Sequence, residues 1–599
     1  MPGLRERLSQ AHARGLATLR QHFRGDLLAG ITVMVVLVPQ ALAYAVLAGV
    51  PPVYGLYAAT IPPLVYALVG SSRFMAIGPV ALTSLMIASG LEGLAEPGTE
   101  QWAELAVLLS FEVGVLFVLF GLVRAGFLVN FLGYPTILGF NAAAGLITAG
   151  SQLRPFFGIP REIAPGLPAT KPWPILLHLD AVHLPTLAVA SGSLVALVSM
   201  RRYAPRWPNY LLVCVVGIVL AWALDLPAHG VAVVGEIPRG LPRPQLPSFE
   251  LDTMRALLPA AASILVIGYV SSITVVKALE AKARGTVEPG RELFAFGLAN
   301  LASGVFGSFP VSSGLARATV TAQAGARTRL TGVIAALGVL AALILAGALF
   351  EWLPRPVLAS IVMLAASSLI DVGGVREVFK TKRADGVTSV LTFIATLVIG
   401  LEVGLAVGIV AALVFFVART TQPHTAELGR VPGTTVYRNI ERVEAAEVCP
   451  QVSMLRIDAP LYYANARFLD DRITSLLAER EPMKLLALDF AAVNDVDATA
   501  VLSLHRLIEA LRAGGNDLHI IGAIGPVRDL FARSGLLELL GEDHMHRNFA
   551  EAAAKLSAAV DRSYCEGTCR AFAFPSCTLI PRAALVRDRA KAARFTPQI

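Results

Sequence analysis

Long apolar runs alternate with short polar breaks through the first 420 residues of the chain. Runs that are long enough to cross a hydrocarbon core of about 30 Å recur throughout this part. The run that begins at Leu27 has no small-residue cleavage site behind it, so it predicts a retained first span and not a signal peptide. In all, the pattern predicts fourteen spans, near residues 27–49, 53–70, 79–91, 103–123, 130–150, 183–200, 208–224, 256–280, 290–308, 311–325, 330–352, 356–371, 385–400 and 403–418.

Two of the predicted spans carry Gly and Pro inside an apolar stretch. The third contains Gly78-Pro79-Val80, and the tenth contains Phe309-Pro310-Val311 followed by Ser312-Ser313-Gly314. A helical run of about three turns follows each, which predicts a half-helix preceded by extended chain. Seven spans separate the two, as an inverted repeat of seven plus seven spans requires. The alternative is that Gly and Pro only kink two ordinary spans.

The pattern changes after residue 420. Short apolar strands at 452–457, 485–490 and 519–524 alternate with helical patterns at 499–511 and from 527, which predicts a small α/β domain over residues 432–560. Residues 561–599 show no packing pattern and are predicted to be a flexible extension.

The distribution of charged residues also separates the first 420 residues from the rest of the chain. The 599-residue chain is 55% apolar and 16% charged, with 50 charged residues among the first 420 and 43 among the last 179. A purely soluble protein is therefore excluded, and the net charge of +7 belongs to membrane loops and not to a nucleic-acid surface. With residues 1–25 in the cytoplasm, 21 Lys and Arg residues lie inside and seven outside, which predicts a cytoplasmic tail.

The half-helices suggest the chemistry. Their amino ends carry unpaired N–H groups and the positive end of the helix dipole, so two such ends facing each other form an anion site. Arg317, one turn into the tenth span, adds a formal charge that must face a cavity or a partner. Two alternatives are that Arg317 extends to the interface or pairs with a buried carboxylate such as Glu112.

Other polar side chains within the spans are weaker candidates. Gln40 and Tyr44 share one helix face, and they line either a polar cavity or an interhelical contact. Ser271, Ser272 and Thr274 form a hydroxyl cluster that either packs helices together or binds an ion. No motif of an enzyme or of a P-loop is present, and no cofactor is expected. Five cysteines without paired C-x2-C spacing, among them Cys565, Cys569 and Cys577, predict no metal site.

At this point the residues resemble the sulfate permease (SulP) family of anion transporters. The motifs that carry the resemblance are Asp26-Leu-Leu-Ala-Gly-Ile-Thr32, Val38-Pro-Gln-Ala-Leu-Ala-Tyr-Ala45, Gly49-Val-Pro-Pro-Val-Tyr-Gly-Leu-Tyr57, Gly78-Pro-Val80, Asn300-Leu-Ala-Ser303 and Gln323-Ala-Gly-Ala-Arg-Thr328, with Asp495-Val-Asp-Ala-Thr-Ala500 resembling the signature loop of a STAS domain. The resemblance implies an α-helical polytopic membrane protein of fourteen spans in a 7+7 inverted repeat, divided into core and gate domains, with a small cytoplasmic α/β STAS domain and usually a homodimer.

The family pattern also implies where the anion lies, between the amino ends of the third and tenth spans and beside the first. The corresponding residues are Gln40, Tyr44, Val80, Ala81, Gly314, Leu315, Ala316 and Arg317. Many relatives carry Ser where this chain has Ala316, and many bacterial relatives carry Glu where it has Ser271. That change leaves Ser271, Thr274 and Glu112 as candidates for coupling to a cation. Because Ala498 occupies the position that regulatory relatives phosphorylate, the loop is predicted not to be a phosphorylation switch unless Thr499 substitutes.

We therefore expect a secondary-active anion transporter that works by alternating access in the inner (plasma) membrane, with both termini cytoplasmic. Sulfate, carried in symport with a proton or sodium, is the first expectation for the substrate. Bicarbonate and dicarboxylates such as fumarate are the alternatives. An uncoupled anion channel and a membrane anion sensor are the alternatives of a different class.

Overall fold

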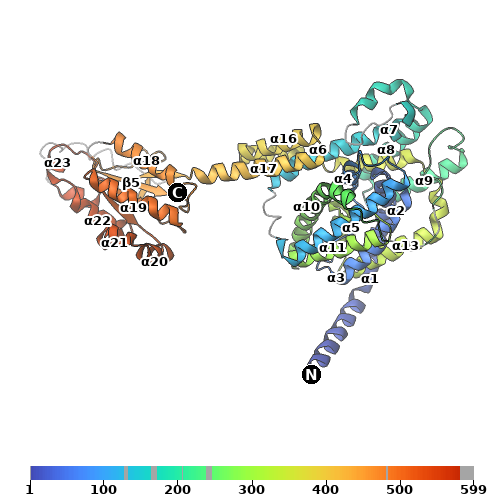
Figure 1. The fold of residues 1–599 in the computed structure, drawn as a ribbon, viewed down its shortest axis with the longest axis horizontal. Helices are drawn as coiled ribbons and strands as arrows, with labels where there is room; N and C mark the ends of the chain where they lie inside the picture. Colours follow the sequence, from blue (N-terminus) through green and yellow to red (C-terminus); the bar gives the residue numbers. More distant parts are fainter. Residues whose placement is uncertain are drawn as a thin grey trace. The chain divides into compact units, whose positions relative to one another are not determined.

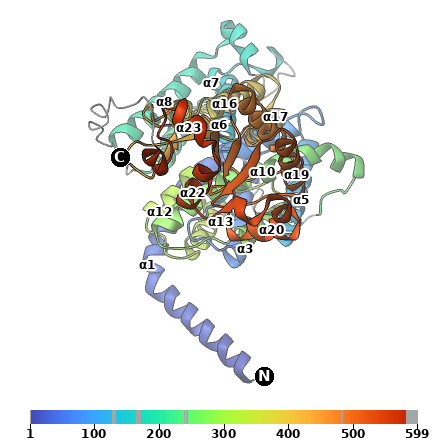
Figure 2. The ribbon, with the colours of Figure 1, turned by 90° about the vertical axis from the view of Figure 1, so that its left-hand side faces the viewer.

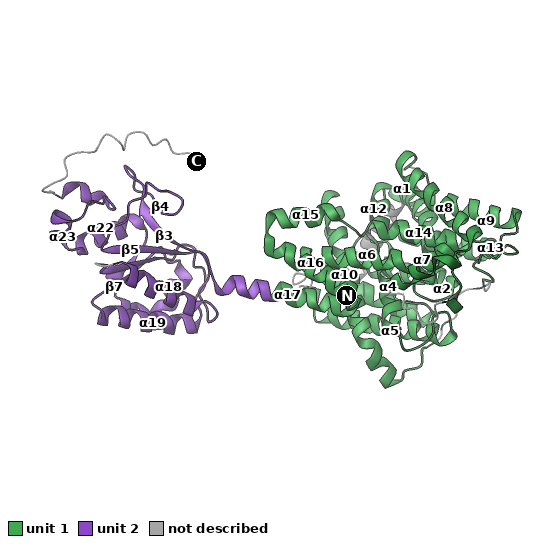
Figure 3. Cartoon of the chain, turned by 90° about the horizontal axis from the view of Figure 1, so that it is seen from above, with its two compact units in different colours: residues 1–413 green, residues 414–599 purple. Residues whose placement is uncertain are grey.

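The structure is a computed structural model of the 599-residue chain (Figure 1). It describes residues 2–126, 133–163, 172–205, 207–237, 240, 244, 246–480 and 483–580, and it describes the side chains of these residues except at 2–21, 161 and 315. Two compact units result, residues 1–413 and 414–599, and the boundary between them falls within a helix, α17 (Figure 3).

Over its described residues, unit 1 is helical apart from two very short strands. Its helices are α1 (Pro2–Leu47), α2 (Pro52–Ala58), α3 (Ile61–Val69), α4 (Ala81–Gly90), α5 (Glu100–Leu122), α6 (Tyr134–Ser151), α7 (Leu153–Phe157), α8 (Leu184–Tyr203), α9 (Asn209–Ala223), α10 (Leu251–Lys282), α11 (Pro289–Val305), α12 (Leu315–Gln323), α13 (Leu330–Phe350), α14 (Arg355–Ser367), α15 (Val372–Thr381), α16 (Arg383–Val398) and α17 (Leu401–Thr421), with 3-10 turns η2 (Arg161–Ile163) and η3 (Trp173–Ala181). A single large cluster of buried apolar side chains joins the helices that surround α1, and it includes Leu42, Leu85 and Phe296.

Among the described residues, eight helical segments are long and apolar enough to cross a membrane, and α4 and α9 are shorter apolar helices. A helical membrane core is therefore confirmed. The number of fourteen spans stays a prediction, because several of the predicted spans are covered by helices too short to meet that length.

One predicted span is divided in two. Residues 53–70 form α2 and α3, which meet at Ala59 and Thr60. Pro62 and Pro63 lie in the first turn of α3. Proline has no N–H to donate and its fixed φ suits the start of a helix, so a second helix begins here instead of the first one continuing.

Unit 2 is built on one six-stranded sheet of order β4-β3-β5-β6-β7-β8. The strands are β3 (Thr425–Arg430), β4 (Tyr437–Asn439), β5 (Val452–Ile457), β6 (Leu485–Asp489), β7 (Asp517–Ile521) and β8 (Met545–His546). β5 to β8 are parallel, and β3 runs antiparallel to both of its neighbours. The helices are α18 (Ala466–Glu479), α19 (Ala498–Ala513), α20 (Gly525–Arg533), α21 (Leu536–Leu540), α22 (Phe549–Ala559) and α23 (Arg562–Gly567), with 3-10 turns η4 (Glu542–His544) and η5 (Pro575–Leu579).

The two faces of this sheet are covered by different helices (Figure 2). Leu486 and Leu488 of β6 pack with side chains of α18 to α21, whereas Leu485 and Ala487 of the same strand pack with side chains of α22 and the segment after it. Alternate residues of a strand point to opposite faces, and this explains the continuous apolar run of β6.

Two of the predicted domain limits are wrong. The sheet begins at Thr425 and not at 432, because β3 pairs with β5. Residues 561–580 were predicted to be flexible, yet they form α23 and η5, and Phe574 is fully buried against the sheet. The prediction failed because these turns are too short to show a helical period in the sequence. Residues 581–599 lie outside the described residues.

Candidate functional site

Two short strands pair where the half-helices begin, and we call this place the crossing. β1 (Ile77–Gly78) leads into α4, and β2 (Ser312–Ser313) leads into α12. The strands pair antiparallel, with Ile77 opposite Ser313 and Gly78 opposite Ser312. The extended chain predicted before each half-helix is confirmed, and the pairing brings the amino ends of α4 and α12 to one place.

Both half-helices begin without a side-chain cap. Val80 and Gly314, the N-cap residues of α4 and α12, are extended and accept no capping bond. The first intrahelical bonds are those from Ser84 N to Val80 O at 2.9 Å and from Ala318 N to Gly314 O at 3.0 Å. The N–H groups before these bonds have no acceptor within the helix, and they carry the positive end of each helix dipole. Two donor sets suited to an anion therefore meet at the crossing.

Gly78 allows the crossing to be tight. Its φ is +151°, a conformation that favours glycine. A Cβ atom at this position would lie 3.3 Å from Nη1 of Arg317 and 3.4 Å from Cδ1 of Leu37. The backbone of β1 consequently approaches the guanidinium of Arg317 at the one residue that has no side chain.

Side chains from three neighbouring helices hold β2 in place. Asn300 of α11 accepts from Val311 N at 2.8 Å and donates to Val311 O at 3.1 Å. The hydroxyl of Ser272 in α10 accepts from Ser313 N at 3.2 Å and lies 3.0 Å from Ser313 O. The hydroxyls of Thr83 and Ser312 are 2.8 Å apart and connect α4 directly to β2. Sequence reasoning did not assign Asn300, Thr83 or Ser312 to the site, although Asn300 lies in one of the recognised motifs. Ser272 was weighed only as a member of the hydroxyl cluster.

Arg317 is the charged group at the crossing. Only 2% of its surface is exposed, and none of Nε, Nη1 and Nη2 has a hydrogen-bond partner among the residues whose positions are described. The same residues include no carboxylate within ion-pair distance of the guanidinium. Arg317 therefore neither extends to the membrane interface nor pairs with Glu112, which were the two alternatives. A buried cation without a partner is costly, and an anion at this point would offset that cost.

The other predicted anion contacts surround Arg317 in different ways. Gln40 and Tyr44 are buried in α1, which packs against both α4 and α12. Ala81 is buried in the first turn of α4, whereas Ala316 is exposed. Val80 and Gly314 are the N-cap residues, half-buried, and the side chain of Leu315 lies outside the described residues.

Comparison with known proteins identifies the family. The sequence model described as "Sulfate permease family" matches residues 23–392, and that of the STAS domain matches residues 445–552. The chain belongs to the sulfate permease family. The members of this family are transporters and not enzymes, and this sulfate permease family member is accordingly a multi-pass membrane protein that transports anions.

Named relatives cover most of the chain. Sulfate transporter 4.1, chloroplastic, of Arabidopsis thaliana is 35% identical over 87% of this chain and 78% of its own. A probable sulfate transporter of Mycobacterium tuberculosis is 33% identical over 88% of this chain and 94% of its own. Among solved structures, the murine Slc26a9 anion transporter in the inward-facing state has a TM-score of 0.81 at 23% identity, covering 89% of this chain and 91% of its own, which shows the shared fold. The transmembrane domain of the cyanobacterium bicarbonate transporter BicA has a TM-score of 0.55 at 26% identity, covering 65% and 97%.

In this sulfate permease family member, the three coupling candidates differ in their surroundings. The Thr274 hydroxyl donates to Val270 O at 2.8 Å within its own helix, α10. The Ser271 hydroxyl and both carboxylate oxygens of Glu112 are buried without a hydrogen-bond partner among the described residues. Among the described residues, no hydrogen bond or ion pair joins Glu112 to Arg317 or to Ser271, so the structure does not bring the candidates together at one site.

In the STAS domain, Asp497 caps α19 by accepting from Ala500 N at 2.8 Å, and it also accepts from Tyr463 N at 2.8 Å. Ala498 and Thr499 are exposed in the first turn of α19. Cys449, Cys565, Cys569 and Cys577 are all buried in this domain. Over the part of the chain that the structure describes, no three or more His, Cys, Asp or Glu side chains are arranged to hold a metal ion.

Proposed function

We propose that this protein is a secondary-active carrier that moves sulfate across the membrane by alternating access. The anion binds between the amino ends of α4 and α12, beside α1, and Arg317 neutralises its charge. The observation that carries the proposal is the guanidinium of Arg317, buried without a partner beside two uncapped helix ends. The names of the relatives support sulfate as the substrate.

The proposed contacts are Gln40, Tyr44, Val80, Ala81, Gly314, Leu315, Ala316 and Arg317. Backbone amides dominate this set, and they recognise charge and size more than chemical identity. Ala316 offers no hydroxyl, so Arg317 and the amides carry a larger share of the binding than in relatives that have Ser at this position.

Bicarbonate is the second candidate substrate. The likeness to the transmembrane domain of the bicarbonate transporter BicA, at 26% identity, favours it specifically. Coupling to a proton or to sodium belongs to the proposal, with Glu112 and Ser271 as the groups available for it inside the spans. The bias of Lys and Arg residues supports cytoplasmic termini in the plasma membrane, and we expect a homodimer.

Transport by the purified protein in liposomes tests the proposal. Labelled sulfate, bicarbonate and fumarate are supplied with and without an inward proton or sodium gradient. Accumulation of sulfate against its gradient, together with counterflow by unlabelled sulfate, is the expected result. Flux far above carrier turnover without counterflow would instead identify an anion channel, and tight sulfate binding with no flux would identify a sensor.

A further inference from the structure

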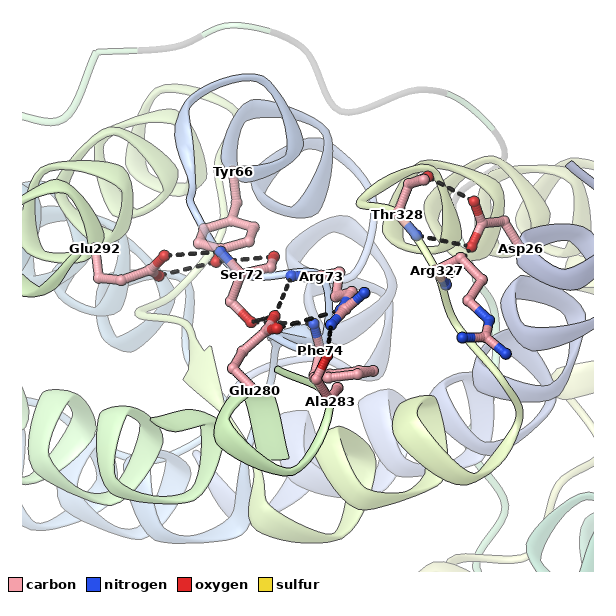
Figure 4. Close-up of polar contacts among 10 residues, drawn as sticks. All are labelled: Asp26, Tyr66, Ser72, Arg73, Phe74, Glu280, Ala283, Glu292, Arg327 and Thr328. Carbon is pink, nitrogen blue, oxygen red and sulfur yellow. Dashed lines mark hydrogen bonds and ion pairs between the residues drawn. The ribbon is translucent and has the colours of Figure 1, made fainter. Parts of the chain in front are cut away.

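Three buried carboxylates hold the chain on either side of the half-helices (Figure 4). We define the entry connector as residues 70–76, which lead into β1, and the exit connector as residues 324–329, which follow α12. Neither connector has regular secondary structure of its own apart from turns. Their paths are therefore fixed by side chains from other elements.

Glu292 of α11 binds the start of the entry connector. Its carboxylate accepts from Ser71 N at 2.7 Å, from Ser71 Oγ at 2.6 Å and from Ser72 N at 3.1 Å, and from the hydroxyl of Tyr66 at 2.8 Å. Glu292 is fully buried. Because a single carboxylate offers about four lone-pair positions, it fixes two successive backbone amides at once.

Glu280, near the end of α10, binds the next residues of the same connector. It accepts from Ser72 Oγ at 2.8 Å and from Arg73 N at 2.9 Å, and it forms an ion pair with Arg73 Nε at 3.2 Å. Nη2 of Arg73 donates to Ala283 O at 3.1 Å. The residues immediately before β1 are thus held to α10, the helix that also supports β2 through Ser272.

Asp26 of α1 binds the exit connector in a matching way. Its carboxylate accepts from Arg327 N at 2.7 Å, from Thr328 N at 3.0 Å and from Thr328 Oγ1 at 2.5 Å, and from Thr331 Oγ1 at 3.1 Å. Asp26 is fully buried. The carboxylate again serves two successive amides and the hydroxyl of a connector residue.

The two connectors are joined to each other and to the crossing. Nη1 of Arg329 donates to Gly70 O at 2.5 Å, across from one connector to the other. Ala326 N donates to Thr321 O at 3.2 Å, and the Thr321 hydroxyl donates to Arg317 O at 2.8 Å. A small pocket lies between the connectors, and Ser72, Arg73, Ile77, Thr321, Arg329 and Thr331 are among the residues that line it.

We propose that Glu292, Glu280 and Asp26 are positioning residues for the anion site. They fix the connectors of both half-helices, and through the connectors they hold the amides of α4 and α12 and the guanidinium of Arg317 at one spacing. The carboxylates do not touch the anion. This inference rests on the proposed function, because it assumes that the anion binds between α4 and α12.

A purely structural role and a positioning role make different predictions. If the carboxylates only stabilise the fold, their variants yield less folded protein, and the protein that folds binds the anion normally. If they position the site, the protein that folds has a raised KM, because a displaced half-helix no longer presents its amides at the right distance.

The test compares sulfate uptake by Glu292→Gln and Asp26→Asn with wild-type protein in liposomes. Each substitution keeps the shape of the side chain and turns one acceptor oxygen into a donor that faces N–H groups. We expect KM to rise about tenfold in each variant, which corresponds to about 1.4 kcal/mol, while Vmax per folded protein changes much less. Tyr66→Phe removes one donor to Glu292 and keeps the ring, so it should fold like wild type and raise KM about threefold.

Asp252→Asn is the matched control, because Asp252 lies in an exposed ion pair with Arg255 near the start of α10. It should leave KM unchanged. Combining Glu292→Gln with Asp26→Asn should raise KM by less than the product of the two single effects, because either displacement already breaks simultaneous contact with the anion. A wild-type KM in the folded Tyr66→Phe and Glu292→Gln proteins would overturn the inference. Absence of sulfate uptake by wild-type protein would instead overturn the proposed function.

Discussion

Gly78→Ala places one methyl group where the two strands cross. The new Cβ would lie 3.3 Å from Nη1 of Arg317 and 3.4 Å from Cδ1 of Leu37. The guanidinium would have to shift by a few tenths of an ångström, away from the position that it takes beside the helix ends. The backbone at φ +151° is also unfavourable for any residue other than glycine.

The size of the effect follows from these two terms. Holding a residue with a side chain in a sparsely populated conformation costs about 1–3 kcal/mol. The chain relieves this strain by moving β1, and the movement displaces both the amides of α4 and Arg317. If the relief appears in anion binding, 1–3 kcal/mol corresponds to a rise in KM of about 5- to 150-fold.

Sulfate uptake in liposomes and thermal unfolding of the purified variant measure the two parts of the effect. Gly347→Ala is the control, because Gly347 lies within α13 and a Cβ there meets nothing within 4 Å. The control should keep the wild-type KM and melt at the same temperature or slightly higher. A folded Gly78→Ala protein with wild-type KM would refute the account of the crossing as the anion site.

Three further predictions concern the support of the site and the STAS domain. Asn300→Leu leaves Val311 N and Val311 O without their partner, so thermal unfolding should show a loss of about 1–3 kcal/mol; unchanged stability would contradict the role of Asn300 in holding β2. Truncation after Val560 removes Phe574 from the core of the STAS domain. Hydrogen exchange in β5 and α22 should therefore become faster than in a protein truncated after Ile580. Equal rates would show that residues 561–580 do not stabilise the domain. Burial and the neighbouring imidazoles of His544 and His546 lower the pKa of His519 to about 4, so the folded domain disfavours the charged form. The stability of the domain should therefore be complete above about pH 6.5 and fall as the pH drops towards 4. Hydrogen-exchange protection in β7 that does not change over this range, after correction for the intrinsic rate, would contradict this.

The sequence predicted the half-helices because their cause is local. Gly and Pro inside an apolar run, such as Gly78-Pro79, interrupt a helix wherever the chain places them. Arg317 was chosen as a candidate for the same kind of reason, since a charge in an apolar span is conspicuous. Likewise β5 and α19 were predicted close to their observed limits, because each carries its own apolar period.

Features that depend on contacts between distant segments could not be predicted. The pairing of Ile77 with Ser313 and the bond from Asn300 to Val311 follow from how the helices pack, and no residue period signals them. The carboxylates of Asp26 and Glu292 read as ordinary charges at the ends of spans, although each binds a connector far away in the sequence. The segment 561–580 was misjudged because its packing rests on a few side chains, such as Phe574, in very short turns.

Sulfate binding to purified wild-type and Arg317→Ala proteins tests the central claim most directly. Titration calorimetry at one pH and ionic strength gives the Kd of each protein, and Asp252→Asn serves as a control for an exposed charge. We predict that Arg317→Ala weakens sulfate binding by at least about tenfold, because a charge-assisted contact is worth about 1.5–3 kcal/mol, while the variant folds like wild type. An unchanged Kd in folded Arg317→Ala protein would contradict the account, because the anion would then bind away from the crossing of β1 and β2.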